Sequence, residues 1–183
     1  MEQMRKFDGP TLHECEDNCK EIYQFWRSLR REGRLPSRAD IDPVKIPRHL
    51  LPNLLLLEPH RPPEGAGLRL WLRLVGTECV EKYGREITGR YLDEVYIAED
   101  YDDTLAQFEA VLHTGHAACM WAETETHDGR AMNYERMLMP LADNGHDIDM
   151  ILAMVVFLPV PAVAKSARLR QAPLASRLRM LNG

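Results

Sequence analysis

Long apolar runs are missing from this 183-residue chain. A membrane-spanning helix needs about 18 or more consecutive apolar residues. The most apolar stretch, residues 150–164, is shorter than that and is interrupted by Pro159 and Pro161. The N-terminal residues MEQMRKFDGP also lack the apolar segment of a secretion signal. We therefore expect a cytoplasmic protein with no membrane segment.

The motifs of common enzyme classes are missing as well. The chain has no phosphate-binding loop, no GxSxG nucleophile turn and no HExxH zinc motif. The Gly65-Ala66-Gly67 segment lacks the third glycine of a dinucleotide-binding turn and precedes a strand pattern, which is the wrong context. We find no nucleophile–base pair, so we expect no catalytic activity.

Cysteine is scarce, with four residues and no CxxC pair. Cys15 and Cys19 lie one helical turn apart and His13 is nearby, but a metal site there would need a fourth ligand from elsewhere in the chain. We interpret the two thiols as small apolar residues on a buried helix face. The sequence thus predicts no bound metal.

The charge is distributed unevenly along the chain. The formal net charge is -5, yet residues 161–183 contain basic residues and no Asp or Glu. This basic C-terminal tail is compatible with an amphipathic helix or with a loose extension. The remainder is acidic, which opposes binding to phosphate backbones, so nucleic acid is not an expected partner.

Residues 11–33 have the pattern of an amphipathic helix. Thr11 and Glu14 match a capping box, and Gly33 is a suitable stop. One stripe of the helix is apolar and contains Cys15, Cys19, Ile22, Tyr23, Trp26 and Leu29. The stripe must be buried against the chain's own sheet, a second subunit or both. We expect a homodimer whose candidate interface residues are Ile22, Tyr23, Trp26 and Leu29.

The rest of the chain alternates between extended and helical patterns. Prolines punctuate residues 34–53, so residues 1–53 form a helix and a connector. The core, residues 54–160, has strand patterns at 54–58, 68–75, 117–126, 131–141 and 148–160 and short helix patterns at 77–83, 91–95 and 102–113. The last strand is apolar on both faces, so it should be covered on both sides. This is an α+β pattern with one sheet.

Three groups of residues carry a resemblance to a known family. The first runs from Trp26-Arg27 through Leu35-Pro36-Ser37-Arg38, Asp42-Pro43 and Ile46-Pro47 to Leu50-Leu51-Pro52-Asn53-Leu54; the second is Leu72-Arg73-Leu74-Val75-Gly76-Thr77 with Tyr83-Gly84-Arg85 and Thr88-Gly89-Arg90; the third is Tyr134-Glu135-Arg136 with Met139-Pro140-Leu141 and Asp149-Met150-Ile151-Leu152. In this order they resemble a bacterial family of stand-alone PAS-like proteins. The resemblance implies a five-stranded antiparallel sheet with helices over one face, with the N-terminal helix expected over the other. It also implies a sensory or regulatory module without a fused effector.

The resemblance places a ligand pocket between the sheet and the central helices. Candidate lining residues are Leu70, Leu72, Leu74, Tyr83, Leu105, Phe108, Met120, Met137 and Met139. Candidate anion contacts are Arg73, Arg85, Arg90 and Arg136, because a guanidinium grips carboxylates and phosphates. Each of these side chains has a structural alternative: the apolar ones can fill an ordinary core, and the arginines can tie loops to nearby carbonyl groups.

Neither of the two cofactors that we weighed for a PAS-like protein is expected here. Covalent flavin binding needs a cysteine in a helix motif rich in asparagine and arginine, and the segment around Cys79 departs from it. Haem needs an axial ligand facing an apolar pocket, whereas His113 and His116 lie beside turn residues.

We therefore expect a module that binds a small ligand, a signalling protein not yet identified, or both. The alternative is a DNA-binding regulator that uses residues 18–51 as a helix-turn-helix, with a cluster of arginines nearby. Pro43 and Pro47 argue against it, because a groove-reading helix tolerates proline poorly.

Overall fold

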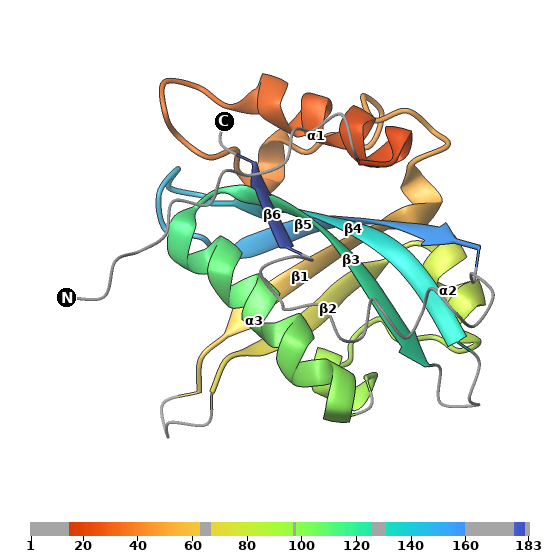
Figure 1. The fold of residues 1–183 in the computed structure, drawn as a ribbon. Coiled ribbons are helices and arrows are strands. Elements are labelled where there is room, and N and C mark those ends of the chain that lie inside the picture. Colours follow the sequence, from red (N-terminus) through yellow and green to blue (C-terminus); the bar gives the residue numbers. More distant parts are fainter. Residues whose placement is uncertain (1–14, 63–66, 97, 126–130, 160–177, 182–183) are drawn as a thin grey trace.

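The strands form one antiparallel sheet in the order β2-β1-β5-β4-β3-β6 (Figure 1). The computed structural model describes residues 15–62, 67–96, 98–125, 131–159 and 178–181. The strands are β1 (Leu54–His60), β2 (Arg69–Val75), β3 (Ala117–Glu125), β4 (Ala131–Leu141), β5 (Met150–Leu158) and β6 (Leu178–Leu181). The five strands expected from the sequence are confirmed, and β6 extends the sheet beyond β3.

Three α-helices and three short 3₁₀ turns complete the described part of the chain. The helices are α1 (Asp17–Leu29), α2 (Thr77–Tyr83) and α3 (Ala98–Thr114), and the turns are Arg38–Asp40, Leu51–Asn53 and Leu92–Glu94. The α+β class is therefore confirmed. No helix in the described ranges is both long and apolar enough to cross a membrane.

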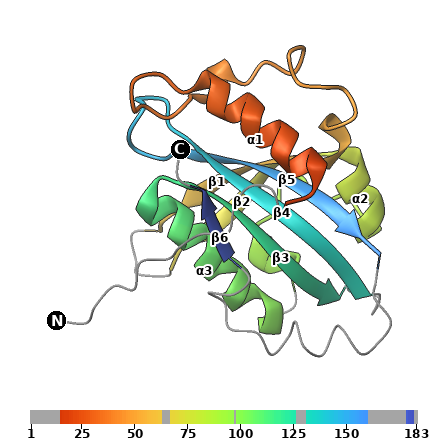
Figure 2. The ribbon, with the colours of Figure 1, turned by 45° about the horizontal axis from the view of Figure 1, so that its top comes forward.

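Helix α1 lies across one face of the sheet and α3 lies on the other, as the two views show (Figures 1 and 2). The apolar stripe of α1 packs on β4 and β5, where Trp26 is fully buried and its indole Nε1 donates a hydrogen bond to the carbonyl of Pro140 at 3.0 Å. The other face is covered by α2, α3 and the turn Leu92–Glu94. Both faces of β5 are thus covered, as its two-sided apolar pattern predicts.

Helix α1 is shorter than the sequence pattern suggested. It ends at Leu29, and the chain turns through left-handed conformations at Glu32 (φ 45°) and Gly33 (φ 78°). Glycine adopts such angles at little cost, so Gly33 marks the turn after the helix instead of its last position. The proposed capping box at Thr11 and Glu14 lies outside the described residues.

The alternation of β2 is interrupted by a β-bulge, which corrects one sequence prediction. Leu72 is opposite Leu57 and Leu74 is opposite Leu56, so Arg73 has no partner of its own. Because the bulge adds one residue to β2, the side chains that follow it point to the opposite face of the sheet from the one that the alternation predicts. Leu74 therefore leaves the pocket side and is 42% exposed, while Val75 packs on the pocket side in its place.

Two further expectations are corrected by the observed elements. Residues 30–53 contain no α-helix, so the helix-turn-helix alternative lacks its recognition helix; the prolines allow only short 3₁₀ turns there. In the basic tail, residues 178–181 form strand β6 on the edge of the sheet, which is neither a helix nor a loose extension. Residues 160–177 lie outside the described part of the chain.

Gly76 sets the position of α2 at the edge of the sheet. Its backbone N–H donates to the carbonyl of Leu54 at 2.8 Å, which joins the start of α2 to β1. A Cβ atom at this position would lie 2.2 Å from the carbonyl oxygen of Pro52. Only glycine fits this approach, and the resulting placement holds Cys79 and Tyr83 over the sheet.

Candidate functional site

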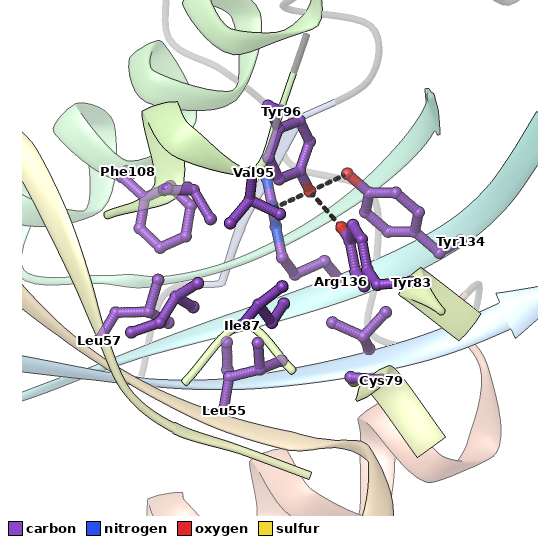
Figure 3. Close-up of a pocket in the computed structure, with 14 residues that line it drawn as sticks. Leu55, Leu57, Cys79, Tyr83, Ile87, Val95, Tyr96, Phe108, Tyr134 and Arg136 are labelled. Carbon is purple, nitrogen blue, oxygen red and sulfur yellow. Dashed lines mark hydrogen bonds between the residues drawn. The ribbon is translucent and has the colours of Figure 1, made fainter. Parts of the chain in front are cut away.

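A small cavity lies between the sheet and the layer formed by α2, α3 and the turn Leu92–Glu94 (Figure 3). Its volume is about 20 Å³, which is room for about one water molecule. The described residues that line it are mostly apolar: Leu55, Leu57, Leu72, Cys79, Tyr83, Ile87, Leu92, Val95, Tyr96, Phe108, Tyr134, Arg136, Ala153 and Val155. No histidine or carboxylate is among them.

Arg136 brings a positive charge into this cavity from the middle of β4. The side chain is only 3% exposed. Its Nη2 donates to Gln107 Oε1 at 2.8 Å and contacts the Met120 sulfur at 3.3 Å. The guanidinium also lies over the ring of Phe108, 4.9 Å from the centroid. Its Nε has no hydrogen-bond partner within the described part of the chain.

Three tyrosine hydroxyls gather beside the guanidinium (Figure 3). Tyr83 donates to the Tyr96 hydroxyl at 3.1 Å, and Tyr96 and Tyr134 share a hydrogen bond of 2.7 Å. Arg136 Nη1 donates to the same Tyr96 oxygen at 3.3 Å. Tyr96, which lies after the turn Leu92–Glu94, is thus the centre of this network, and the partners named here include no carboxylate.

The environment raises the pKa of both Tyr83 and Arg136. Burial raises the pKa of Tyr83, and the neighbouring hydroxyls of Tyr96 and Tyr134 raise it further. Burial acts to lower the pKa of Arg136, but the nearby tyrosines outweigh it and the net shift is upward. The site therefore presents a fixed positive charge and several hydroxyl dipoles at neutral pH.

Cys79 contributes the sulfur atom of the cavity wall from the middle of α2. Its side chain is fully buried. Burial, and secondarily the charge of Glu78, raises the pKa of the thiol to about 12. The thiol is therefore protonated at neutral pH and is a poor nucleophile.

The pocket residues predicted from the sequence divide into three groups. Leu72, Tyr83 and Phe108 line the cavity. Leu70, Leu105 and Met120 pack in the same core without lining it. Met137 and Met139 face the opposite side of the sheet, beneath α1, and Leu74 is turned away by the bulge. These last three assignments were wrong. For Met137 and Met139 the reason is that both faces of β4 are buried, so its sequence does not reveal which face meets the pocket.

The candidate arginines also separate in the structure. Only Arg136 reaches the cavity. Arg73 is exposed and pairs with Glu58 at 2.5 Å, and the Arg85 Nη2 donates to the carbonyl of Glu94 at 3.3 Å. Arg90 is exposed at the turn before Tyr91. Arg73 and Arg85 therefore have the structural role that the sequence left open, because each holds a neighbouring segment through a carboxylate or a carbonyl group.

The candidate interface residues are packed in the core of their own chain. Ile22, Tyr23 and Trp26 are at most 3% exposed, and Leu29 is partly buried against the same cluster. The apolar stripe of α1 is satisfied by its own sheet, so these side chains do not offer an interface surface. The two histidines weighed as haem ligands, His113 and His116, are absent from the cavity wall.

Tyr96 and Tyr134 are the functional candidates that sequence reasoning missed. Tyr134 precedes Arg136 by two positions on β4, so the period of a strand could have placed both on one face. Tyr96 follows a 3₁₀ turn in a segment without periodicity, and no local pattern marks it.

An antiparallel sheet with helices over a small internal cavity is the architecture of a PAS-type module. A sequence model of the PAS domain matches residues 16–156, which is more than half of the chain. The chain therefore belongs to the PAS domain family. The matched region includes α1 and the proline-rich connector, so these are part of the domain. No curated protein matches the sequence.

Solved structures with the same fold are distant in sequence. A light-oxygen-voltage domain studied with a flavin analogue is 13% identical, with a TM-score of 0.50 over 67% of this chain and 87% of that one. A PAS domain from Colwellia psychrerythraea is 10% identical, with a TM-score of 0.49 over 64% and 98%. The Rhodobacter sphaeroides LOV protein is 13% identical, with a TM-score of 0.47 over 81% and 73%. At 13% identity, the first of these structures shows a shared fold and nothing about function.

The cavity does not fit a flavin in this conformation. Pockets for ligands of such size measure roughly 300 Å³ or more, whereas this one measures about 20 Å³. Cys79 does line the cavity, but its thiol is protonated and the sequence around it departs from the flavin-binding motif. The absence of bound flavin stays a prediction, to be tested by the absorption spectrum of the purified protein.

Proposed function

We propose that the protein is a sensory module that binds a small carboxylate in the Arg136 cavity and transmits the result by contact with another protein. The observation that carries the proposal is the buried guanidinium of Arg136, which has no carboxylate partner in the described part of the chain. A buried charge without an opposite charge is costly. A ligand carboxylate would provide the missing charge.

The hydroxyl of Tyr96 marks where a ligand oxygen could bind. Tyr83 and Arg136 donate to this oxygen, and Tyr134 lies at 2.7 Å from it. Converging donors of this kind suit a carboxylate oxygen better than a phenol, because a carboxylate accepts several hydrogen bonds and carries charge.

The size of the cavity implies that binding displaces Tyr96. Its side chain is only partly buried, and the present cavity has a volume of about 20 Å³. Rotation of the phenol toward solvent would free Arg136 and enlarge the space between Phe108 and the sheet. Ligand binding would in this way change the surface around the turn Leu92–Glu94, which gives the protein a signal to pass on.

The experiment is a thermal-unfolding screen of the purified chain against small aliphatic and aromatic carboxylates, with the matching alcohols or amides as uncharged controls. We expect at least one carboxylate to raise the unfolding temperature while its uncharged analogue does not. Arg136→Met should abolish the shift, and Tyr96→Ala should enlarge it because no phenol has to be displaced. A shift that survives Arg136→Met would contradict the proposal.

Arg73→Met is the matched control variant, because Arg73 is an exposed arginine of β2 that is paired with Glu58 of β1. It should bind every ligand as the unaltered protein does. The unliganded Arg136→Met protein should unfold at a temperature no lower than the unaltered protein, since the change removes an uncompensated buried charge and keeps the volume. This also separates a binding defect from a folding defect.

The remaining parts of the proposed function concern output. We propose that the module has no catalytic activity and that it acts as a homodimer and through a signalling protein. The core positions of Ile22, Tyr23 and Trp26 mean that a dimer would use other surfaces. Sedimentation velocity of the full chain over a range of concentrations tests the dimer, and a single monomeric species at all of them would exclude it.

A further inference from the structure

Three thiols and one carboxylate meet on the face of the sheet opposite the Arg136 cavity, beneath the start of α1. The ligand atoms of Cys15, Cys119 and Glu135 all lie within 4.8 Å of one another. The Cys19 thiol lies beside this group, in hydrogen-bond contact with Cys119. All four side chains are at most 4% exposed.

The fold brings these groups together from three elements. Cys15 lies two residues before α1, and Cys19 lies in the first turn of that helix. Cys119 on β3 is opposite Met137 of β4, and Glu135 is two residues before Met137. Cys119 and Glu135 are therefore diagonal neighbours on one side of the sheet. The docking of α1 on this side brings Cys15 to Cys119 and Glu135 and places the Cys19 thiol against Cys119.

Glu135 is a buried carboxyl group that is held by two N–H donors. One carboxylate oxygen accepts the backbone N–H of Glu16 at 2.6 Å, and the other accepts the indole N–H of Trp121 at 2.7 Å. Among the described residues, no lysine, arginine or histidine forms an ion pair with it. A buried carboxylate normally pairs with a cation or coordinates a metal.

We propose that Cys15, Cys19, Cys119 and Glu135 form a binding site for Zn²⁺. Zn²⁺ prefers four ligands in tetrahedral arrangement and accepts both cysteine sulfur and carboxylate oxygen. Each coordinating thiol would release its proton to solvent as the metal binds. The N–H groups of Glu16 and Trp121 would remain on the carboxylate and orient it.

The role of such a site would be structural. Four protein ligands leave no open coordination position for a substrate. Two ligands precede or belong to α1 and two belong to the sheet, so the metal would clamp the helix onto the sheet. The sequence prediction of no metal rested on a missing fourth ligand for Cys15 and Cys19, and Cys119 and Glu135 supply two further donors.

Metal titration of the full chain tests the site. The reduced protein, stripped with a chelator, is titrated with Co²⁺, whose visible ligand-field bands report tetrahedral thiolate coordination, and then with Zn²⁺ in competition. We expect one ion per chain and a rise in unfolding temperature with Zn²⁺. Cys119→Ala should abolish the bands, and Glu135→Gln should weaken Zn²⁺ binding at least about tenfold.

Cys79→Ala is the matched control, because Cys79 is a buried thiol on the other face of the sheet. It should bind Co²⁺ and Zn²⁺ as the unaltered chain does. If Cys119→Ala fails to fold, the proposal is tested by the Zn²⁺ affinity of Glu135→Gln and by the number of metal ions bound per unaltered chain. The proposal is overturned if no ion binds, if binding survives Cys119→Ala, or if the reduced chain forms a disulfide at Cys119 in air and takes up no metal. None of these outcomes bears on ligand binding by Arg136.

Discussion

The role of Arg136 depends on the side chains that surround it. Four arginines in the family-like segments were equal candidates for anion contact, since each has the same guanidinium. Only Arg136 is enclosed by Phe108, Gln107 and the tyrosines, where water cannot offset its charge. The exposed arginines reach nearby carboxylates or carbonyls, or solvent, where such interactions contribute little.

Cys79 gives a prediction about stability at alkaline pH. Its thiol has a pKa of about 12 in the folded chain, against an ordinary value of 9.0. Between these values the unfolded chain loses a proton that the folded chain keeps, so this thiol makes folding less favourable as pH rises. Cys79→Ala lacks the thiol. The stability advantage of the unaltered protein over this variant should shrink by about 1 kcal/mol for each pH unit above 9.

Urea unfolding of both proteins at pH 7, 8, 9 and 10 measures this difference. The advantage should be constant between pH 7 and 8, where the thiol is protonated in both states, and this interval serves as the control. An advantage that stays constant up to pH 10 would mean that Cys79 is accessible to solvent in the folded protein.

Strand β2 shows how a local irregularity changes the face of an element. The alternating leucines of residues 68–75 predict a common pocket side, and this holds up to Leu72. The bulge at Arg73 then moves Leu74 to the other side and brings Val75 inward. The pattern of a single strand cannot reveal the bulge, because it arises from the pairing of β2 with β1.

A pair of leucine truncations tests the bulge. Leu72 is fully buried, so Leu72→Ala should lower the free energy of unfolding by about 2–5 kcal/mol. Leu74 is 42% exposed, so Leu74→Ala should change it by no more than about 0.5 kcal/mol. Urea unfolding of the two variants measures both values. Equal losses would place the two leucines on the same face and argue against the bulge.

At the scale of the whole molecule, the sheet is covered on both faces by parts of the same chain. Helix α1 and the connector cover one face, while α2, α3 and the turn Leu92–Glu94 cover the other. Removing either cover would expose a continuous apolar surface on β4 and β5, and such surfaces cause association or unfolding. The N-terminal helix is therefore an integral part of the domain.

Deletion of residues 1–33 tests this conclusion. The shortened chain should be insoluble or lack a cooperative unfolding transition, because Trp26 and the rest of the α1 stripe no longer cover the sheet. Soluble yield and circular dichroism during heating measure the effect. A soluble deletion variant with an unchanged unfolding temperature would show that α1 is dispensable.

Most of the elements, the α+β class and the covered last strand could be inferred from the sequence, because strands and helices impose periods of 2 and about 3.6 on neighbouring residues. Gly33 likewise marked the turn after a helix, where the chain adopts a positive φ angle. These features depend on residues close together in the chain.

The tertiary structure alone decided which side chains share a site. The burial of Arg136 among Tyr83, Tyr96 and Tyr134 and the meeting of Cys15 with Cys119 and Glu135 join residues that are far apart in the sequence. Such contacts follow from strand register and helix docking, which are set by the packing of the whole core. No local period encodes them, so the tyrosine partners of Arg136 and the cluster of thiols with Glu135 became visible only in the folded chain.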